Sequence, residues 1–363
     1  MNIIEICQKV KAKVSQKGRT YQVWSVLVLV ALGLLCNVNS VAGISRFGKR
    51  LVKSQLIKLG FIKCRSPCHS TILEALNRVD VSDLEKLIGE GSRDADKHAI
   101  IDIDGKVLRG SKCMDEKALH VLGAFFNTIL LPVGQVMLSE EENEITGMLK
   151  LLETIDIKGK TLTGDAIFAQ KKIVDMIDKK EGYFVFTVKD NQENLRRELE
   201  KAFAESPAEK FEGYSEGADK AHGRIEERSI KMIEMPWDYN NEWRHIKKIG
   251  RITRVRHKKV QGKWQKTTEE AYVITSCNAI SAEELLKLNR GHWSVENRIH
   301  WVRDVVLRED HCTVHKRTAA QVLTALRNIV IARIKKVSNA FTAKREEFAH
   351  RPRLAFKLLF ASG

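Results

Sequence analysis

The sequence predicts an α/β domain preceded by a small, all-helical domain. From residue 100 onwards, short apolar and β-branched runs alternate with amphipathic helical stretches, and aspartates stand within or directly after two of those runs. Residues 1–88, in contrast, show helical patterns. Between the two parts, residues 89–97 have the glycine-containing, polar composition of a linker. We therefore expect domain boundaries at residues 1–88 and 98–363.

Length and charge limit the class of protein. The chain has 363 residues, enough for two or three domains, and no internal repeat. Its formal net charge of +16 implies a polyanionic partner, either nucleic acid or an anionic membrane surface. Its seven cysteines are scattered, which is typical of reduced thiols in the cytoplasm. Cys64, Cys68 and His69 lack the second ligand pair of a usual zinc site, so zinc is the weaker alternative there.

The amino-terminal part contains the most apolar stretch, residues 23–38. It follows a basic start, as a signal peptide does, but it begins late for one. Its apolar core is shorter than the roughly 20 residues that a membrane span needs. We therefore expect a buried helix and no membrane partner. Two further helices before residue 88 have candidate caps, Ser70 or Thr71 for the first and Ser82 for the second.

The α/β part follows the order β-β-β-α-β-α-β. The expected elements are strands at 100–108, 120–127 and 130–139, a helix at 144–152, a strand ending in Asp165, a helix at 171–180 and a strand at 183–188. The first three strands are close enough in sequence to form an antiparallel meander, within a mixed sheet that has helices on both faces. Acidic residues on the first and fourth strands complete the layout of a ribonuclease H-like core.

A β-rich insertion is expected at residues 205–277, after a charged helix at 193–204. Residues 244–266 hold ten Lys or Arg and no acid, and they include a hairpin with strands at 249–260 and 264–276. Lysines can merely protect an exposed strand edge from aggregation. Ten cations without an acid favour a track for phosphates instead. A long basic amphipathic helix is expected at 318–336.

Residues 290–310 are predicted to form a helix that holds acidic side chains in fixed positions on one face. Four residues, His292, Glu296, His300 and Asp304, follow at i, i+4 steps and share one face. Two histidines and a glutamate on one helix fit a tetrahedral zinc ion poorly. Taken alone, Glu296 has the simpler interpretation of an ion-pair partner of Arg303 or His292.

Three separate stretches contribute acids to one predicted metal site. The strand at 100–108 carries Asp102 and Asp104, and Asp165 ends a later strand. Aspartate is a poor strand residue and is costly to bury unpaired, although a strand-end aspartate is often only a cap. Together with Glu296, these residues suggest carboxylates that converge on Mg²⁺ or Mn²⁺. The pattern alone does not choose between Asp102 and Asp104.

Six motifs give the chain a resemblance to a known family. They are IDGKVLRGS at 103–111, ENEI at 142–145, GDAIFAQK at 164–171, VKDNQ at 188–192, HGRIEER at 222–228, and HWSVENRIHWVRDV at 292–305 with RED at 308–310. In this order and spacing they resemble the DDE transposases of bacterial insertion sequences, in particular the H-repeat-associated proteins. The helical stretch before residue 88 also resembles the amino-terminal domain associated with that family.

The resemblance implies a function and a catalytic triad. It implies metal-dependent DNA cleavage at the ends of an insertion sequence and strand transfer into target DNA, by a homodimer in the bacterial cytoplasm, close to the nucleoid. The triad that also binds two Mg²⁺ or Mn²⁺ ions falls on Asp104, Asp165 and Glu296. A basic residue follows the glutamate by seven positions in related transposases, and Arg303 stands there. Asn289 and His292 replace the tyrosine and arginine of those relatives.

Basic residues near the acids and in the insertion are the expected contacts to double-stranded DNA. The candidates are Lys106, Arg109, Lys189, Arg254, Arg256, Lys258, Lys259, Arg298 and Arg303. Two other functions stay open from the sequence. One is a DNA-binding remnant of a transposase that has lost catalysis, and the other is a related metal-dependent nuclease without strand transfer.

Overall fold

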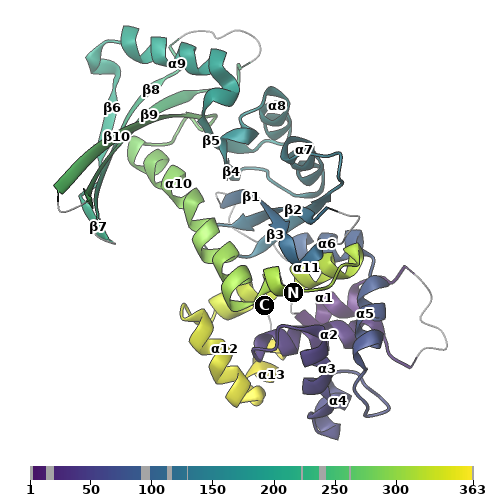
Figure 1. Ribbon diagram of the computed structural model, residues 1–363. Coiled ribbons are helices and arrows are strands. Elements are labelled where there is room, and N and C mark those ends of the chain that lie inside the picture. The colour runs from purple at the N-terminus through teal and green to yellow at the C-terminus, as the bar shows by residue number, and fades with distance from the viewer. Residues whose placement is uncertain are drawn as a thin grey trace.

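The fold is described from a computed structural model. It covers residues 3–13, 20–90, 99–112, 117–128, 130–221, 224–236, 243–260 and 263–361, and for residues 221, 260 and 292–297 it describes the backbone alone. Figure 1 shows an elongated molecule with a helical part at one end and a strand-rich part at the other.

Ten strands form one mixed sheet, in the spatial order β3-β2-β1-β4-β5-β10-β9-β8-β6, with β7 paired to β8 (Figure 1). The strand bounds are β1 Ile100–Leu108, β2 Leu119–Phe126, β3 Pro132–Leu138, β4 Thr161–Gly164, β5 Tyr183–Val188, β6 Glu212–Ser215, β7 Asp219–Ala221, β8 Arg224–Glu234, β9 Lys248–Val260 and β10 Lys263–Thr275. The pairs β1–β4 and β4–β5 are parallel, whereas β1–β2 and β2–β3 are antiparallel. The predicted mixed α/β sheet is thus confirmed.

Helices lie on both faces of this sheet. In the sheet-containing part, the α-helices are α7 Glu144–Thr154, α8 Lys171–Lys179, α9 Glu193–Glu205 and α10 Ala282–Val295. Short 3₁₀ turns are η1 Arg109–Ser111, η2 Ala166–Phe168, η3 Asp190–Gln192, η4 Ala208–Lys210 and η7 Glu309–His311. The helix α10 continues through two π-helical stretches, η5 Glu296–His300 and η6 Val302–Val306. Irregular π turns within a long helix occur often at functional sites.

The alternation along β1 separates a core face from a polar face. Ile101 and Ile103 are fully buried and pack with α7 and α8 in one hydrophobic cluster. Because successive side chains of a strand point to opposite faces, Asp102, Asp104 and Lys106 share the other face. The long helical run from α10 to η6 covers that face, as the contacts of Asp104 and Lys106 with it show.

The β-rich insertion extends the main sheet. Its strand β10 pairs with β5 in antiparallel register, with Tyr272 opposite Val188, and β9 and β8 follow outward. The predicted hairpin is confirmed as β9 and β10, which pair along thirteen residues each. The insertion and the core are therefore one continuous hydrogen-bonded surface, which periodicity along the chain does not reveal.

The amino-terminal helices share their core with the end of the chain. Their bounds are α1 Ile3–Lys9, α2 Val23–Leu35, α3 Val41–Lys49, α4 Lys53–Lys58, α5 His69–Asn77 and α6 Val81–Glu90, and the carboxy-terminal ones are α11 Arg317–Lys335, α12 Phe341–His350 and α13 Pro352–Phe360. One buried cluster contains side chains from both sets. The helices at residues 1–88 therefore share their hydrophobic core with α11–α13, and the boundary at residue 88 stays a prediction.

The helices α2 and α11 are both buried in this shared core. The apolar helix α2 is buried along nearly its whole length, as expected. The long helix predicted at 318–336 is α11, but its residues from 319 to 334 are almost all buried, so it lacks the exposed polar face of an amphipathic helix. No helix within the described ranges is both long enough and apolar enough to cross a membrane.

A buried arginine ties the two ends of the chain to the long helix. Arg345 of α12 donates hydrogen bonds to the backbone oxygens of Leu34 (2.9 Å) and Val306 (2.8 Å) and to the side-chain oxygen of Asn39 (2.6 Å). These oxygens include carbonyls at helix ends that have no partner within their own helix. The end of η6 is therefore held by both the amino-terminal and the carboxy-terminal helices.

Candidate functional site

Two of the predicted acids lie side by side on the neighbouring strands β1 and β4, at the carboxyl end of β4. The parallel strands β1 and β4 pair with Asp102 opposite Thr163 and Ile103 opposite Gly164. Asp104 follows Ile103 on β1, and Asp165 directly follows Gly164 at the end of β4. The two aspartates are therefore at the same level along the two strands. Side chains at matching positions of parallel neighbours point to the same face of a sheet. The fold therefore brings together two acids that are 61 positions apart in sequence.

The helix that carries the third predicted acid lies against Asp104. His300 Nδ1 is 3.3 Å from Asp104 Oδ2, and His300 is largely buried. Glu296 begins η5, four residues before His300, so its backbone is about one helical turn from this contact. The side chain of Glu296 is outside the described part of the chain. The assignment of Glu296 accordingly stays a prediction that rests on the course of the helix.

The two aspartates already have hydrogen-bonding partners. Asp104 accepts from the Gly105 amide at 2.9 Å, and Asp165 accepts from the Ala166 amide at 2.7 Å. Lys189, which follows β5, places its Nζ 3.2 Å from Asp165 Oδ1. The predicted phosphate contact Lys189 is thus beside a predicted metal ligand, and its side chain is about half exposed.

Asp102 has a structural role. It is fully buried, and it accepts hydrogen bonds from Thr163 on β4 and from Asn127 after β2. Burial raises the pKa of Asp102 to about 6, and these hydrogen bonds oppose that rise. The ambiguity between the two β1 aspartates is thereby reduced, because Asp104 is the one that is partly exposed and meets the long helix.

Oxygen ligands of the kind that Mg²⁺ and Mn²⁺ prefer are present at this end of β4. The side chains of Asp104 and Asp165 are 28% and 58% exposed, so both carboxylates are accessible to an ion. Among the described side chains, no group of three His, Cys, Asp or Glu residues could hold a metal. The described side chains do not include those of Glu296 and His292, but they do include the free thiols of Cys64 and Cys68.

A buried ion-pair cluster lies beyond Asp104 on the same face of β1. At its centre is Glu309, which is 2.6 Å from Arg303 Nε, 3.0 Å from Arg327 Nη1 and 3.6 Å from Lys106 Nζ. Lys106 also pairs with Asp304. Burial favours a higher pKa for Glu309, but the charges of these three cations lower it to about 2. The cluster connects β1, η6 and α11.

This burial argues against direct contact with DNA for two of the predicted residues. Arg303 is 2% exposed and Lys106 is 8% exposed, and each is committed to a carboxylate. A cation in this setting does not reach a phosphate without leaving its partner unpaired in the interior, which is costly. Their role in this structure is to hold the Glu296 helix against β1. Sequence reasoning missed Glu309, although it lies within the RED motif at 308–310.

Arg298 and Arg109 have different surroundings. Arg298 donates to the backbone oxygens of Asn127 (3.2 Å) and Thr128 (3.4 Å), which joins the long helix to the end of β2. Arg109 is 81% exposed, and its Nε is 3.9 Å from an oxygen of Asp310. Of these two candidates, Arg109 is the one that a phosphate can approach from solvent.

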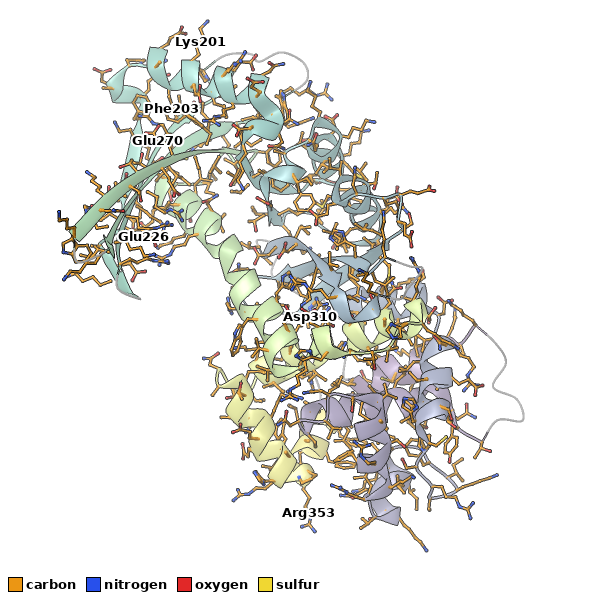
Figure 2. The ribbon with its side chains drawn as sticks, viewed as in Figure 1. Lys201, Phe203, Glu226, Glu270, Asp310 and Arg353 are labelled. Carbon is orange, nitrogen blue, oxygen red and sulfur yellow. The ribbon has the colours of Figure 1, made fainter. Side chains whose placement is uncertain are left out.

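A cleft of about 720 Å³ opens beside Asp165, between the insertion and α10. Six cations and five carboxylates line it. At its centre Glu226, labelled in Figure 2, is 2.7 Å from Arg228, 3.2 Å from Arg256 and 3.8 Å from Arg254. Burial favours a higher pKa for Glu226, but the hydrogen bond from Arg256 and the nearby arginines hold the pKa below its ordinary value.

The arginines predicted as a phosphate track are therefore partly neutralised. Arg254 and Arg256 also pair with Glu269 of β10. These acids come from neighbouring strands, so the acid-free stretch at 244–266 did not reveal them. Lys258 and Lys259, nearer the tip of the same hairpin, are exposed. Of the four predicted DNA contacts in this hairpin, the two lysines are thus the ones most accessible from solvent.

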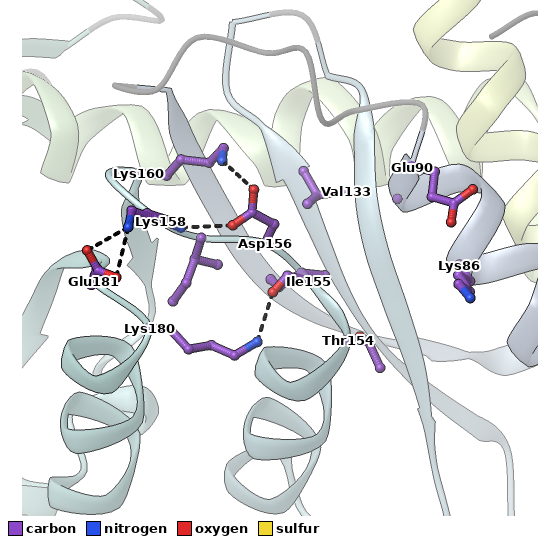
Figure 3. A pocket seen from close by; sticks show the side chains of 12 residues that line it. Lys86, Glu90, Val133, Thr154, Ile155, Asp156, Lys158, Lys160, Lys180 and Glu181 are labelled. Atoms are coloured by element: carbon purple, nitrogen blue, oxygen red, sulfur yellow. Dashed lines mark hydrogen bonds and ion pairs between the residues drawn. The ribbon is translucent and has the colours of Figure 1, made fainter.

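A second pocket, of about 390 Å³, is lined by residues of α6 and β3 and of the segments before β4 and β5 (Figure 3). Four lysines line it, but three have partners: Lys160 Nζ is 3.3 Å from Asp156, Lys158 is 2.9 Å from Glu181, and Lys180 donates to the Ile155 carbonyl at 3.0 Å. Burial lowers the pKa of Lys180. These contacts hold the loop before β4, and none of the residues that line the pocket is a predicted metal ligand or DNA contact.

Comparison with known proteins identifies the family of the chain. The model of the family described as "Transposase DDE domain" matches residues 95–333. The chain belongs to this family. The matched range of the DDE transposase family includes β1, β4 and the long helix, and therefore all three predicted acids.

Two relatives from Escherichia coli (strain K12) cover most of the chain. "H repeat-associated putative transposase YhhI" is 31% identical over 315 residues, covering 84% of this chain and 83% of the relative. "Putative protein YbfL" is 31% identical over 316 residues with the same coverage of each. The resemblance to H-repeat-associated DDE transposases is thereby confirmed. A chain of a piggyBac transposase synaptic complex with hairpin DNA aligns with a TM-score of 0.46 at 12% identity, over 98% of this chain and 75% of that chain.

Proposed function

We propose that this member of the DDE transposase family cleaves DNA at the ends of an insertion sequence and transfers the released strand into target DNA. The observation that carries the proposal is the matched position of Asp104 and Asp165 on adjacent parallel strands, next to the helix that bears Glu296. The strand order and the acids on β1 and after β4 are those expected of a ribonuclease H-like core.

The three acids are proposed to hold the divalent ions. Mg²⁺ or Mn²⁺, when bound by carboxylates, can activate an attacking oxygen and stabilise the leaving 3′ oxygen of a phosphodiester. Asp104, Asp165 and Glu296 would hold these ions with their carboxylate oxygens. Lys189 pairs with Asp165. If an ion were to take up that carboxylate, the ammonium group of Lys189 would be free to contact a DNA phosphate. A nucleophilic side chain is not needed for this chemistry.

The long helix has a positioning role in this proposal. His300 Nδ1 lies 3.3 Å from Asp104 Oδ2, and the cluster around Glu309 holds η6 against β1. Preorganised ligands avoid the cost of rearranging at the moment of reaction. A homodimer that pairs two DNA ends is part of the proposal, since each element has two ends to be cut.

The direct test uses purified protein, Mn²⁺ and duplex DNA that carries candidate element ends. Cleavage followed by joining to a target duplex is the expected result. Binding without cleavage would instead identify a remnant that has lost catalysis. Cleavage without joining would identify a metal-dependent nuclease. Sequencing the DNA that flanks the coding region supplies the inverted repeats for the substrate.

The exposed lysines of the insertion give a second prediction. The double variant Lys258→Gln/Lys259→Gln is expected to bind DNA with a weaker salt dependence. Each lost phosphate contact lowers the magnitude of the slope of log K against log[salt] by about 0.9, so a decrease of roughly 2 is expected. Fluorescence anisotropy over a range of salt concentrations measures the slope.

The matched control is Arg197→Gln/Lys201→Gln on α9. Each of these cations already pairs with a glutamate one helical turn away, Arg197 with Glu193 and Lys201 with Glu205. The control therefore removes the same net charge from a face that is already neutralised. Equal slopes for the two double variants would remove the lysines from the DNA interface.

A further inference from the structure

A strongly basic surface lies at the end of the molecule opposite the insertion. From residue 6 to residue 73 the sequence contains no Asp or Glu. Within that stretch, α3, α4 and the following loop carry seven exposed cations, which we call the basic end surface: Arg46, Lys49, Arg50, Lys53, Lys58, Lys63 and Arg65. Figure 1 places α3 and α4 at the end of the helical part, remote from β9 and β10.

The cations of the basic end surface differ from those of the cleft. No ion pair within the described part of the chain involves any of the seven. In the cleft, by contrast, Glu226 alone is within 4 Å of Arg228, Arg254 and Arg256. Fixed positive charge that is not neutralised internally attracts a polyanion and releases its counterions on binding. The basic end surface is therefore the larger concentration of uncompensated charge.

The surroundings of the seven cations also favour an external partner. Three apolar side chains are unusually exposed between them, Val52 at 59%, Ile57 at 57% and Ile62 at 88%. Arg353 of α13 is exposed, and Figure 2 shows it at the same end of the molecule. The cations are spread over two helices and a loop, and this arrangement suits an extended polyanion.

We propose that the basic end surface binds the phosphate backbone of duplex DNA, separately from the cleft beside Asp165. The choice of DNA as the polyanion rests on the proposed function. The duplex carries one negative charge per about 1.7 Å of its axis, so a row of lysines on successive elements can meet several phosphates. The contact is to the backbone, and it is expected to tolerate changes of base sequence.

The test compares two triple variants of the full-length chain by anisotropy with duplex DNA, in buffer without divalent ions. The surface variant is Lys53→Gln/Lys58→Gln/Lys63→Gln. The control is Lys158→Gln/Arg197→Gln/Lys201→Gln, which removes three cations that already pair with acids. The surface variant is expected to lose about 2 to 3 from the magnitude of the salt slope, and the control less than 1.

Several outcomes would overturn the inference. Equal slopes for the parent chain and the surface variant would do so. So would a surface variant that loses binding to vesicles containing phosphatidylserine while its DNA binding is unchanged, because the partner would then be a membrane. A preference for one base sequence that the surface variant abolishes would contradict a backbone contact.

The design separates this inference from the proposed function. Binding is measured without divalent ions, so it does not depend on cleavage. A parent chain that cuts and joins DNA, with no effect of the surface variant on the slope, refutes only the second DNA surface. A parent chain that does not cut, with the expected loss of slope, refutes only the catalytic proposal.

Discussion

Replacing Asp104 with asparagine is expected to reduce DNA cleavage by about a thousand-fold or more. The proposed ions each contribute several kcal/mol of transition-state stabilisation, and every 1.4 kcal/mol corresponds to roughly a factor of ten in rate. Asparagine keeps the size of the side chain but removes the charge that holds a divalent ion. The rate of strand cleavage with Mn²⁺, on a duplex that carries an element end, measures the effect.

DNA binding by Asp104→Asn should be retained, since the exposed lysines of the hairpin are unchanged. The same losses are expected for Asp165→Asn and Glu296→Gln. The informative control is Asp102→Asn, two residues away on the same face of β1, whose carboxyl is buried against Thr163 and Asn127. If Asp104→Asn cleaves as fast as the parent, or if only Asp102→Asn is inactive, the assignment of the site is wrong.

The substitution Glu309→Gln is expected to destabilise the fold by about 3–5 kcal/mol, the usual cost of breaking a buried ion pair. It leaves Arg303 and Arg327, both 2% exposed, without a counter-charge. The free energy of unfolding in urea measures the change. Glu181→Gln is the control, because Glu181 and its partner Lys158 are both more than 60% exposed and such pairs contribute little.

The pH dependence follows from the lowered pKa of Glu309. A carboxyl whose pKa falls from 4.5 to about 2 on folding stabilises the folded state above pH 4.5. This contribution is lost as the pH falls from 4.5 toward 2, because the unfolded chain then binds the proton first. The difference in unfolding free energy between the parent and Glu309→Gln should shrink over that range. A constant difference would contradict the proposed role of the charge.

The sequence predicted local structure well where side-chain alternation was strong. The strands that became β1, β5, β9 and β10, and the helix at 144–152, lie within two residues of their expected bounds. Aspartate inside an apolar run was informative because burial of a carboxylate needs a reason. That reasoning found the two aspartates, whereas only the course of β1 and β4 shows that Asp104 and Asp165 stand at one level.

The contacts that the sequence does not reveal all join distant segments. Arg303 and Lys106 seemed available for DNA because their partner, Glu309, is brought to them only by the packing of α11 and η6 on β1. Arg254 and Arg256 seemed unpaired because Glu226 and Glu269 lie on neighbouring strands. The helices before residue 90 seemed independent because α11–α13, which complete their core, come more than 220 residues later.

The pairing of β10 with β5 has a mechanical consequence. The distal hairpin and the strand that leads to Lys189, the partner of Asp165, belong to one stiff ribbon. The same β10 leads within a few residues into α10, and hence to the stretch that bears Glu296. We expect a tilt of the hairpin, such as a bound nucleic acid would impose, to shift Asp165 and Glu296, two of the three proposed metal ligands, together. Shortening the hairpin should therefore alter catalysis even where it touches no DNA.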